Sequence, residues 1–339
     1  PRLGRRRRPS GDGRILPAHL ALKPYQPPAW LPGGHAQTIW PLLIKPRPLK
    51  LRRERWETPD GDFVDVDHLD GPADAPLLVL FHGLEGSAQS HYALSTAHAC
   101  HKAGWRLALP HFRGCSGELN RKPRAYHSGD SDEIDWILRR LCATNGGRPL
   151  HAAGVSLGGN ALLKWAGERG SAASELVTGV AAICAPLDLA ACGHHLARGF
   201  NRVYTRHFLQ TMRVVSAARL KQFPGLFDEA KMRAAINLYQ FDDAVTAPVH
   251  GFAGADDYWL RASSKPWLKS IAVPTVTVNA KNDPFLPASY LPKPSEVSAF
   301  VRLEHPAGGG HVGFVSGTFP GNLDWLPQRL LHFFLSETS

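Results

Sequence analysis

The sequence predicts an α/β fold, with a mainly parallel central sheet flanked by helices and an inserted helical cap. Continuous apolar runs such as "PLLVLFHG" at residues 76–83 are typical of strands that are buried on both faces. These runs alternate with helix-like segments, which is the order expected when helices connect parallel strands. With 339 residues, of which 43% are hydrophobic, the chain can build a sizeable core without disulfides or bound metal.

The expected elements follow one another in a simple order. Two strands at 53–57 and 62–68 are joined by a turn at Pro59-Asp60-Gly61. Further strands are expected within 76–83, 105–114, 149–156, 177–186, 273–285 and 297–314, and helices at 92–103, 131–144, 159–169 and 326–337. The helix at 131–144 has acidic residues at its start and one apolar face, formed by Ile134, Ile137, Leu138 and Leu141.

The strand and helix alternation divides the chain into a tail and one folded domain. Residues 1–29 are basic and then proline-rich, so we expect a flexible tail, and residues 30–339 form a single domain. The alternation stops at about 188 and resumes near 268; the segment between is helix-like and predicts the inserted cap. Its apolar residues, Leu189, Phe200, Tyr204, Phe208 and Leu209, suit either an acyl pocket or packing within the cap.

The net charge of +10 is concentrated at the start of the chain. Residues 1–14 hold six arginines and one aspartate, a net charge of +5 over that segment. A solvated tail is the simplest interpretation, and contact with an anionic membrane surface or nucleic acid is the alternative. We expect no nucleic-acid partner for the folded domain.

The cysteine pattern indicates free thiols. The five cysteines form no CxxC pair and no zinc-binding spacing: Cys100, Cys115, Cys142, Cys184 and Cys192. An odd, scattered set favours a reducing compartment, so we expect a cytoplasmic location and no metal site. No run of 18 apolar residues is present, so no transmembrane helix is expected.

The candidate nucleophile is Ser156, in the sequence Gly154-Val155-Ser156-Leu157-Gly158 between a predicted strand and a predicted helix. A serine in so sharp a turn needs small residues two positions before and after it, and the following helix directs N–H groups at a developing negative charge. The alternatives are a structural turn or a phosphate-binding turn. The lysine of a phosphate-binding loop is absent here.

A serine hydroxyl needs a base, and the base needs an orienting acid. Asp283 directly follows the strand "PTVTVNA", and His311 lies in "AGGGHVGF", a glycine-rich loop that we expect to be mobile. The order Ser, Asp, His is the one expected when each residue follows a strand of such a sheet. The alternatives are that Asp283 only caps a turn and that His311, one of 17 histidines, is an inert loop residue. Asp188, Asp256 and Asp257 follow no fitting strand end.

Two backbone N–H groups are candidates for an oxyanion hole. One belongs to Leu157, directly after the nucleophile, and the other to Leu84 in "FHGLEG", where Gly83 and Gly86 let the backbone turn. We expect His82 to support this loop by hydrogen bonding. No metal-binding spacing such as HExxH accompanies it.

The chain resembles the α/β-hydrolase superfamily and, more closely, its YheT-like branch, the AB hydrolase 4 family. The resemblance runs from about Trp30 to the C-terminus and rests on "WLPGGHAQTIWP", "FHGLEGSAQSHY", "HFRGCSGELNRKPRAYHSGDSDE", "GVSLGGNALLKW", "VTAPVHGF", "NAKNDPFLP" and "GGGHVGF". It implies a Ser156, Asp283 and His311 triad that hydrolyses short- to medium-chain acyl esters without a metal or organic cofactor.

Three functions remain compatible with these residues. The first is a carboxylesterase, with an acylglycerol lipase as a variant of it. The second is an acyltransferase in which an alcohol replaces water, and the third is a non-catalytic binding protein.

The motif "HFRGCSGELNRKPRAYHSGD" holds four residues that could line the site: Arg113, Tyr126, His127 and Asp130. We favour a different role for them, a buried network that braces the loop. Cys115 in the same motif is not a candidate nucleophile.

Overall fold

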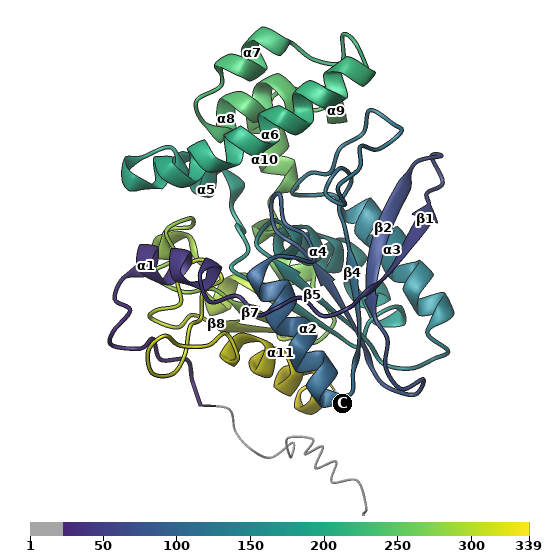
Figure 1. Cartoon of the computed structure of the whole chain (residues 1–339), viewed down its shortest axis with the longest axis vertical. Coiled ribbons are helices and arrows are strands. Elements are labelled where there is room, and N and C mark those ends of the chain that lie inside the picture. The colour runs from purple at the N-terminus through teal and green to yellow at the C-terminus, as the bar shows by residue number, and fades with distance from the viewer. Residues whose placement is uncertain (1–22, 339) are drawn as a thin grey trace, which may run out of the picture.

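The computed structural model describes residues 23–338, and an eight-stranded sheet runs through them (Figure 1). The strands are β1 (Arg52–Glu57), β2 (Phe63–Leu69), β3 (Leu77–Phe81), β4 (Arg106–Pro110), β5 (Leu150–Val155), β6 (Gly179–Ile183), β7 (Thr275–Val278) and β8 (Val301–Glu304). Their order is β1-β2-β4-β3-β5-β6-β7-β8. The two pairs β1–β2 and β2–β4 are antiparallel and the other pairs are parallel, so the predicted fold class is confirmed.

Helices cover both faces of this sheet. The helices outside the long insertion are α1 (Gly34–Ile39), α2 (His91–Ala103), α3 (Ser131–Thr144), α4 (Leu157–Arg169) and α11 (Trp325–Ser336). Helices α2 and α11 pack together on one face, and α3 and α4 pack together on the other. Short 3-10 turns complete this part of the chain: η1 (Trp40–Leu42), η2 (Gly170–Glu175), η5 (Lys265–Ser270), η6 (Ala288–Tyr290) and η7 (Pro294–Glu296).

Strand β3 explains why its sequence reads as one continuous apolar run. Leu77, Val79 and Phe81 enter the core beneath α3 and α4, whereas Leu78 and Leu80 enter the core beneath α2 and α11. Successive side chains of a strand point to opposite faces, so both faces of β3 must be apolar. The connection after β3 leads to β4 on one side, and the connection after its neighbour β5 leads to β6 on the other. In such sheets the ligand site lies outside the carboxyl ends of the strands at this reversal.

A helical insertion lies between β6 and β7 and forms the upper part of the molecule in Figure 1. It contains α5 (Leu189–Leu196), η3 (Gly199–Asn201), α6 (Arg202–Gln222), α7 (Glu229–Ala234), α8 (Leu238–Phe241), a π-helix η4 (Asp242–Thr246), α9 (Ala247–His250) and α10 (Ala255–Ala262). The next segment, η5, already packs against α4. Within η5, Trp267 fills the space beside Gly167 of α4. The chain has therefore returned to the main body before residue 268, where the sequence predicted the end of the cap.

The folded body begins earlier than the predicted tail boundary at residue 29. Tyr25 is 7% exposed, donates a hydrogen bond to the Val315 carbonyl and packs against Phe314 and Trp325. Proline-rich composition hid this anchor, because a single buried aromatic residue makes no periodic pattern. Residues 1–22, which carry most of the predicted basic tail, lie outside the described part of the chain.

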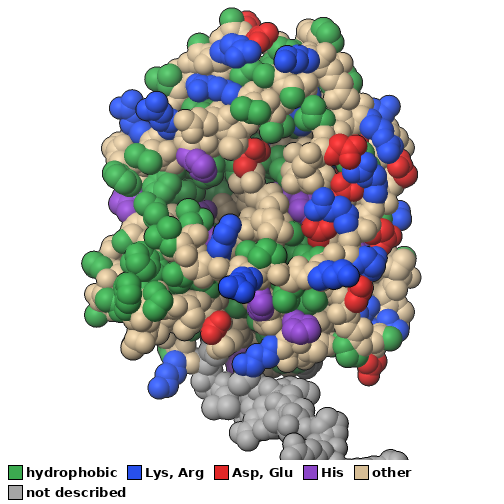
Figure 2. Space-filling model, in the orientation of Figure 1, with side chains coloured by type: hydrophobic (Ala, Val, Ile, Leu, Met, Phe, Trp, Pro, Cys, Tyr) green, Lys and Arg blue, Asp and Glu red, His purple; other side chains and the backbone are tan. Residues whose placement is uncertain are grey.

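Charged residues cover the antiparallel edge of the sheet. Figure 2 shows acidic and basic side chains interspersed on the right of the molecule. On β1, Arg53 pairs with Asp67 and Arg55 pairs with Asp65, both across to β2. Charges on an edge strand oppose pairing with other chains. Within residues 23–338, no helix is long and apolar enough to cross a membrane.

Candidate active site

Ser156 occupies a strained turn between β5 and α4. Its backbone has φ 52° and ψ −120°, a conformation that L-residues rarely adopt and that is held in place by the surrounding packing. A Cβ on Gly154 would lie 2.4 Å from the Gly158 carbonyl oxygen, and a Cβ on Gly158 would lie 2.5 Å from the His82 carbonyl oxygen. The small residues predicted around the serine are therefore required by backbone contacts.

The structure brings together the three residues predicted for the catalytic group. His311 Nε2 lies 2.9 Å from Ser156 Oγ, and His311 Nδ1 lies 2.9 Å from Asp283 Oδ2. A carboxylate can only accept, so Nδ1 carries the proton and Nε2 is left to accept from the serine hydroxyl. Asp283 also accepts from the Phe285 N–H, and the Phe285 ring stacks on the imidazole with centroids 3.9 Å apart.

The loop after β3 leaves one N–H group available beside the serine. Gly83 donates its N–H to Tyr92, Glu85 donates to Tyr126, and Gly86 donates to the Gly83 carbonyl. Among residues 23–338, the N–H of Leu84 has no acceptor, and neither has the N–H of Leu157 at the first turn of α4. These are the two donors that the sequence predicted for an oxyanion hole.

His82 connects this loop to the next strand. Its Nε2 accepts from the Phe112 N–H at 3.0 Å, so its Nδ1 is the protonated nitrogen and donates to the Gly83 carbonyl at 2.7 Å. Burial lowers the pKa of His82 to about 3, which keeps the ring neutral. With both nitrogens engaged, His82 fixes the loop that carries Leu84.

The glycine-rich loop that carries His311 is held by α1 and by Asn282, and these contacts were not predicted from the sequence. Gln37 Oε1 accepts from the Gly309 N–H, Thr38 Oγ1 accepts from the His311 N–H, and Asn282 Oδ1 accepts from the Gly310 N–H. The sequence predicted a mobile loop, and these three hydrogen bonds would oppose its motion. A Cβ on Gly313 would lie 1.9 Å from the Gln37 carbonyl oxygen, so glycine there permits close packing. The motif "WLPGGHAQTIWP" was the available signal for α1, although nothing in it indicated this role.

One cysteine approaches the same residues. Ligand atoms of Cys184, Asp283 and His311 lie within 4.8 Å of one another, an arrangement that could in principle hold a metal ion. However, the Cys184 sulfur accepts from the Val312 N–H, and burial raises the pKa of its thiol far above the ordinary value. Metal binding needs the thiolate, so the donor set fits a hydrogen-bonded thiol better than a metal ligand.

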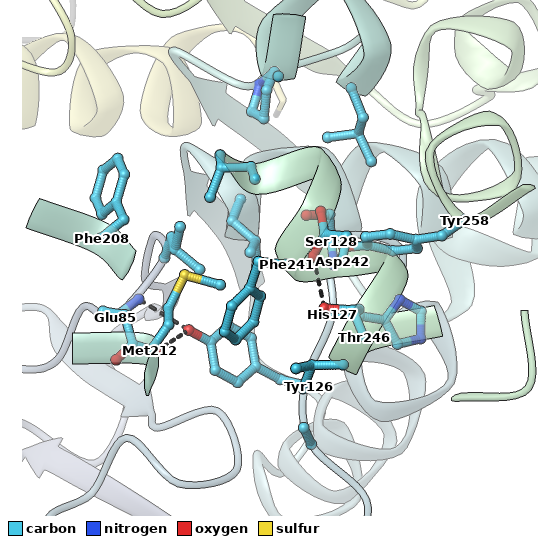
Figure 3. Close-up of a pocket in the computed structure, with 18 of the residues that line it drawn as sticks. Glu85, Tyr126, His127, Ser128, Phe208, Met212, Phe241, Asp242, Thr246 and Tyr258 are labelled. Atoms are coloured by element: carbon cyan, nitrogen blue, oxygen red, sulfur yellow. Dashed lines mark hydrogen bonds between the residues drawn. The ribbon is translucent and has the colours of Figure 1, made fainter. Parts of the chain in front are cut away.

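Ser156 and His311 open onto a cavity of about 140 Å³ beneath the insertion (Figure 3). Its walls come from the loop after β3, from the 113–128 segment and from the insertion. The lining is mostly apolar and includes Leu84, Tyr126, Leu189, Phe208, Met212, Val215, Leu238, Phe241, Val245 and Phe285. Of the five residues predicted to suit an acyl pocket or packing within the cap, Leu189 and Phe208 line the cavity and Leu209 is buried within the insertion. Tyr204 packs against a neighbouring apolar cluster, and Phe200 is exposed.

The 113–130 segment combines both roles that the sequence left open. Arg113 bonds to three carboxylates and Asp130 bonds to Arg124, so these two brace the segment. Tyr126 donates its hydroxyl proton to Glu85. Both Tyr126 and His127 line the cavity. Arg113 also contributes to the cavity wall.

Comparison with known proteins places the chain in a family. The family described as alpha/beta hydrolase fold matches residues 76–318. The chain belongs to this family. It is 41% identical over 303 residues to "Putative esterase YheT" of Escherichia coli, covering 87% of this chain and 88% of that protein. It is also 28% identical to "Phospholipase ABHD3" of Mus musculus, covering 94% and 80%. The resemblance to the YheT-like branch is confirmed.

Solved structures support the fold. An esterase from Exiguobacterium antarcticum matches with a TM-score of 0.53 at 18% identity, covering 84% of this chain and 100% of that one. Est1E from Butyrivibrio proteoclasticus matches with a TM-score of 0.53 at 12% identity, covering 83% and 98%. At these identities the likeness concerns the fold alone.

Proposed function

We propose that the protein is a carboxylic ester hydrolase that acts on short- to medium-chain acyl esters through Ser156, His311 and Asp283. The observation that carries the proposal is the hydrogen-bonded series from Asp283 through His311 to Ser156, beside two unoccupied N–H groups and an apolar cavity. Relatives named esterase and phospholipase support the same chemistry.

The reaction proceeds in two halves. Ser156 Oγ attacks the ester carbonyl while His311 Nε2 takes its proton and then gives it to the departing alcohol. Asp283 keeps the imidazole in the required tautomer and stabilises the imidazolium. The N–H groups of Leu84 and Leu157 donate to the oxygen that becomes negative. Water, deprotonated by His311, then attacks the acyl-serine ester, releasing the acid and restoring the serine.

The test is a chain-length series of p-nitrophenyl esters measured on wild type and Ser156→Ala. We expect wild-type hydrolysis with an optimum at short to medium acyl chains, and a loss of at least about 10³-fold in kcat for the variant. A serine-reactive phosphonate should label wild type and leave Ser156→Ala unlabelled. Equal labelling, or equal hydrolysis by both proteins, would contradict the proposal.

A further inference from the structure

Three arginines are buried in the part of the chain that the structure describes, and one of them differs from the other two. Arg113, Arg219 and Arg329 are each at most 6% exposed. Arg113 pairs with three carboxylates and Arg329 with two. The guanidinium of Arg219 forms no hydrogen bond, ion pair or ring contact with any residue between 23 and 338.

Arg219 lines the cavity that Ser156 and His311 also line. It lies on the cavity face of α6, where Phe208, Met212 and Val215 precede it at helical spacing. The lining residues of this helix are thus apolar from Phe208 to Val215, and Ser216 and Arg219 follow them. The guanidinium lies beside Gly114, since a Cβ added to that glycine would be 3.3 Å from Arg219 Nη2.

A charge buried without a partner is costly, so its retention calls for an explanation. Burial lowers the pKa of Arg219, while the nearby carboxylates of Glu85 and Asp62 favour its charged form. Neither carboxylate pairs with it. Glu85 accepts from Tyr126 (Figure 3), and Asp62 pairs with Arg113. The cavity that Ser156 lines therefore also presents an unpaired guanidinium.

We propose that Arg219 binds an anionic group, a carboxylate or a phosphate, carried by the ester that Ser156 cleaves. The planar fork of an arginine matches both groups with two parallel hydrogen bonds. The apolar residues of α6 then contact the hydrocarbon between the ester and the anion. This inference rests on the proposed function, because it names the substrate class of the same site.

Matched ester pairs test the inference and identify the side of the ester that bears the anion. On the acyl side, mono-p-nitrophenyl glutarate is compared with p-nitrophenyl pentanoate. On the alcohol side, 1-butyrylglycerol 3-phosphate is compared with 1-butyrylglycerol. The readout is the ratio of kcat/KM for the anionic member to that for the neutral member.

We expect Arg219→Gln to lower this ratio by about 10- to 100-fold in at least one pair, since hydrogen bonds to a charged group are lost. The neutral member of each pair is measured in parallel, so that any general effect of the substitution on the cavity cancels in the ratio. Arg219→Lys should retain part of the ratio. Arg206→Gln, on the exposed side of the same helix, is the matched control and should leave the ratio unchanged. Unchanged ratios for Arg219→Gln in both pairs would overturn the inference.

A binding measurement separates this inference from the proposed function. Calorimetry with glutarate and with glycerol 3-phosphate is done on Ser156→Ala, with and without Arg219→Gln. If wild type hydrolyses no ester, the proposed function fails, but anion binding that depends on Arg219 would still support the anion site. If neither anion binds in an Arg219-dependent way in that case, the site is overturned as well. The melting temperature of Arg219→Gln should not fall, because the substitution removes a buried unpaired charge.

Discussion

Asp283 performs two tasks with its two carboxylate oxygens. Oδ2 accepts from His311, and Oδ1 accepts from the Phe285 N–H within its own loop. An asparagine can keep the second contact through its carbonyl oxygen, which directs its amide N–H at His311. That amide forces the imidazole to accept at Nδ1, so the proton moves to Nε2, where the serine needs an acceptor.

The substitution Asp283→Asn should therefore impair chemistry and leave folding intact. We expect kcat for p-nitrophenyl butyrate to fall by about 10⁴-fold, with an unchanged far-UV spectrum. Asp256→Asn is the matched control, since Asp256 is exposed in the insertion and its carboxylate accepts from Tyr239. A loss of less than tenfold for Asp283→Asn would assign the orienting role to another group.

At the scale of elements, α1 holds the loop of the proposed base, and none of its residues lines the cavity. Thr38 accepts from the His311 N–H and donates to the Gly34 carbonyl, which connects the helix to the histidine loop. We expect Thr38→Val to leave the His311 N–H unpaired and to lower kcat by about 10- to 100-fold through misplacement of the imidazole. KM should change little. Thr38→Ser keeps the hydroxyl and should restore kcat; failure of this rescue would mean that the methyl group matters instead.

The π-helix η4 provides a pH-dependent element. Asp242 is buried and accepts from Thr246 and Trp259, and burial raises its pKa to about 6. The folded state therefore binds this proton more tightly than the unfolded state. The contribution of Asp242 to the free energy of unfolding is therefore complete below its unfolded pKa near 4, and it is lost as the pH rises through 6.

Urea unfolding at pH 5 and pH 8 tests this sign. The Asp242 carboxyl should make the protein about 1.4 kcal/mol more stable at pH 5 than at pH 8. Asp242→Asn should remove that share of the difference. Comparing the pH 5 to pH 8 difference between the two proteins cancels any hydrogen bond that the variant loses equally at both pH values. An identical difference in both proteins would show that Asp242 does not titrate in this range.

The sequence predicted elements whose pattern is local and missed those that depend on distant contacts. The helix at 131–144 and the strand end before Ser156 follow from apolar periodicity and small residues. The order of Ser156, Asp283 and His311 follows from strand ends meeting at one edge of the sheet. Nothing periodic links Tyr25 to Phe314, Gln37 to Gly309, or Arg219 to the cavity, because each contact joins segments far apart in the chain.

At the scale of the whole molecule, the insertion has a core of its own beside those of the sheet, and it shares a smaller apolar cluster with Phe285, Leu286 and Leu291 of the main body. The sheet has one apolar core on each face. The insertion has its own, formed by Leu209, Phe227, Met232, Ala235, Phe241, Ala244 and Val245. The cavity lies where the insertion meets the ends of the strands. Because this core belongs to the insertion alone, we expect the insertion to loosen more readily than the sheet, which would open the cavity that Ser156 lines.

Met232→Ala tests this independence. Met232 lies in α7 at 0% exposure, and its truncation should destabilise the insertion core by about 2–5 kcal/mol. Hydrogen exchange followed by mass spectrometry should show amides of α6 to α8 exchanging about 30-fold faster or more, with α3 and α4 unchanged. Leu162→Ala, in the core beneath α4, is the control and should accelerate exchange in α3 and α4. If Met232→Ala instead accelerated exchange throughout the sheet, the insertion would unfold only with the whole molecule, and substrate entry would need a path that leaves the insertion closed.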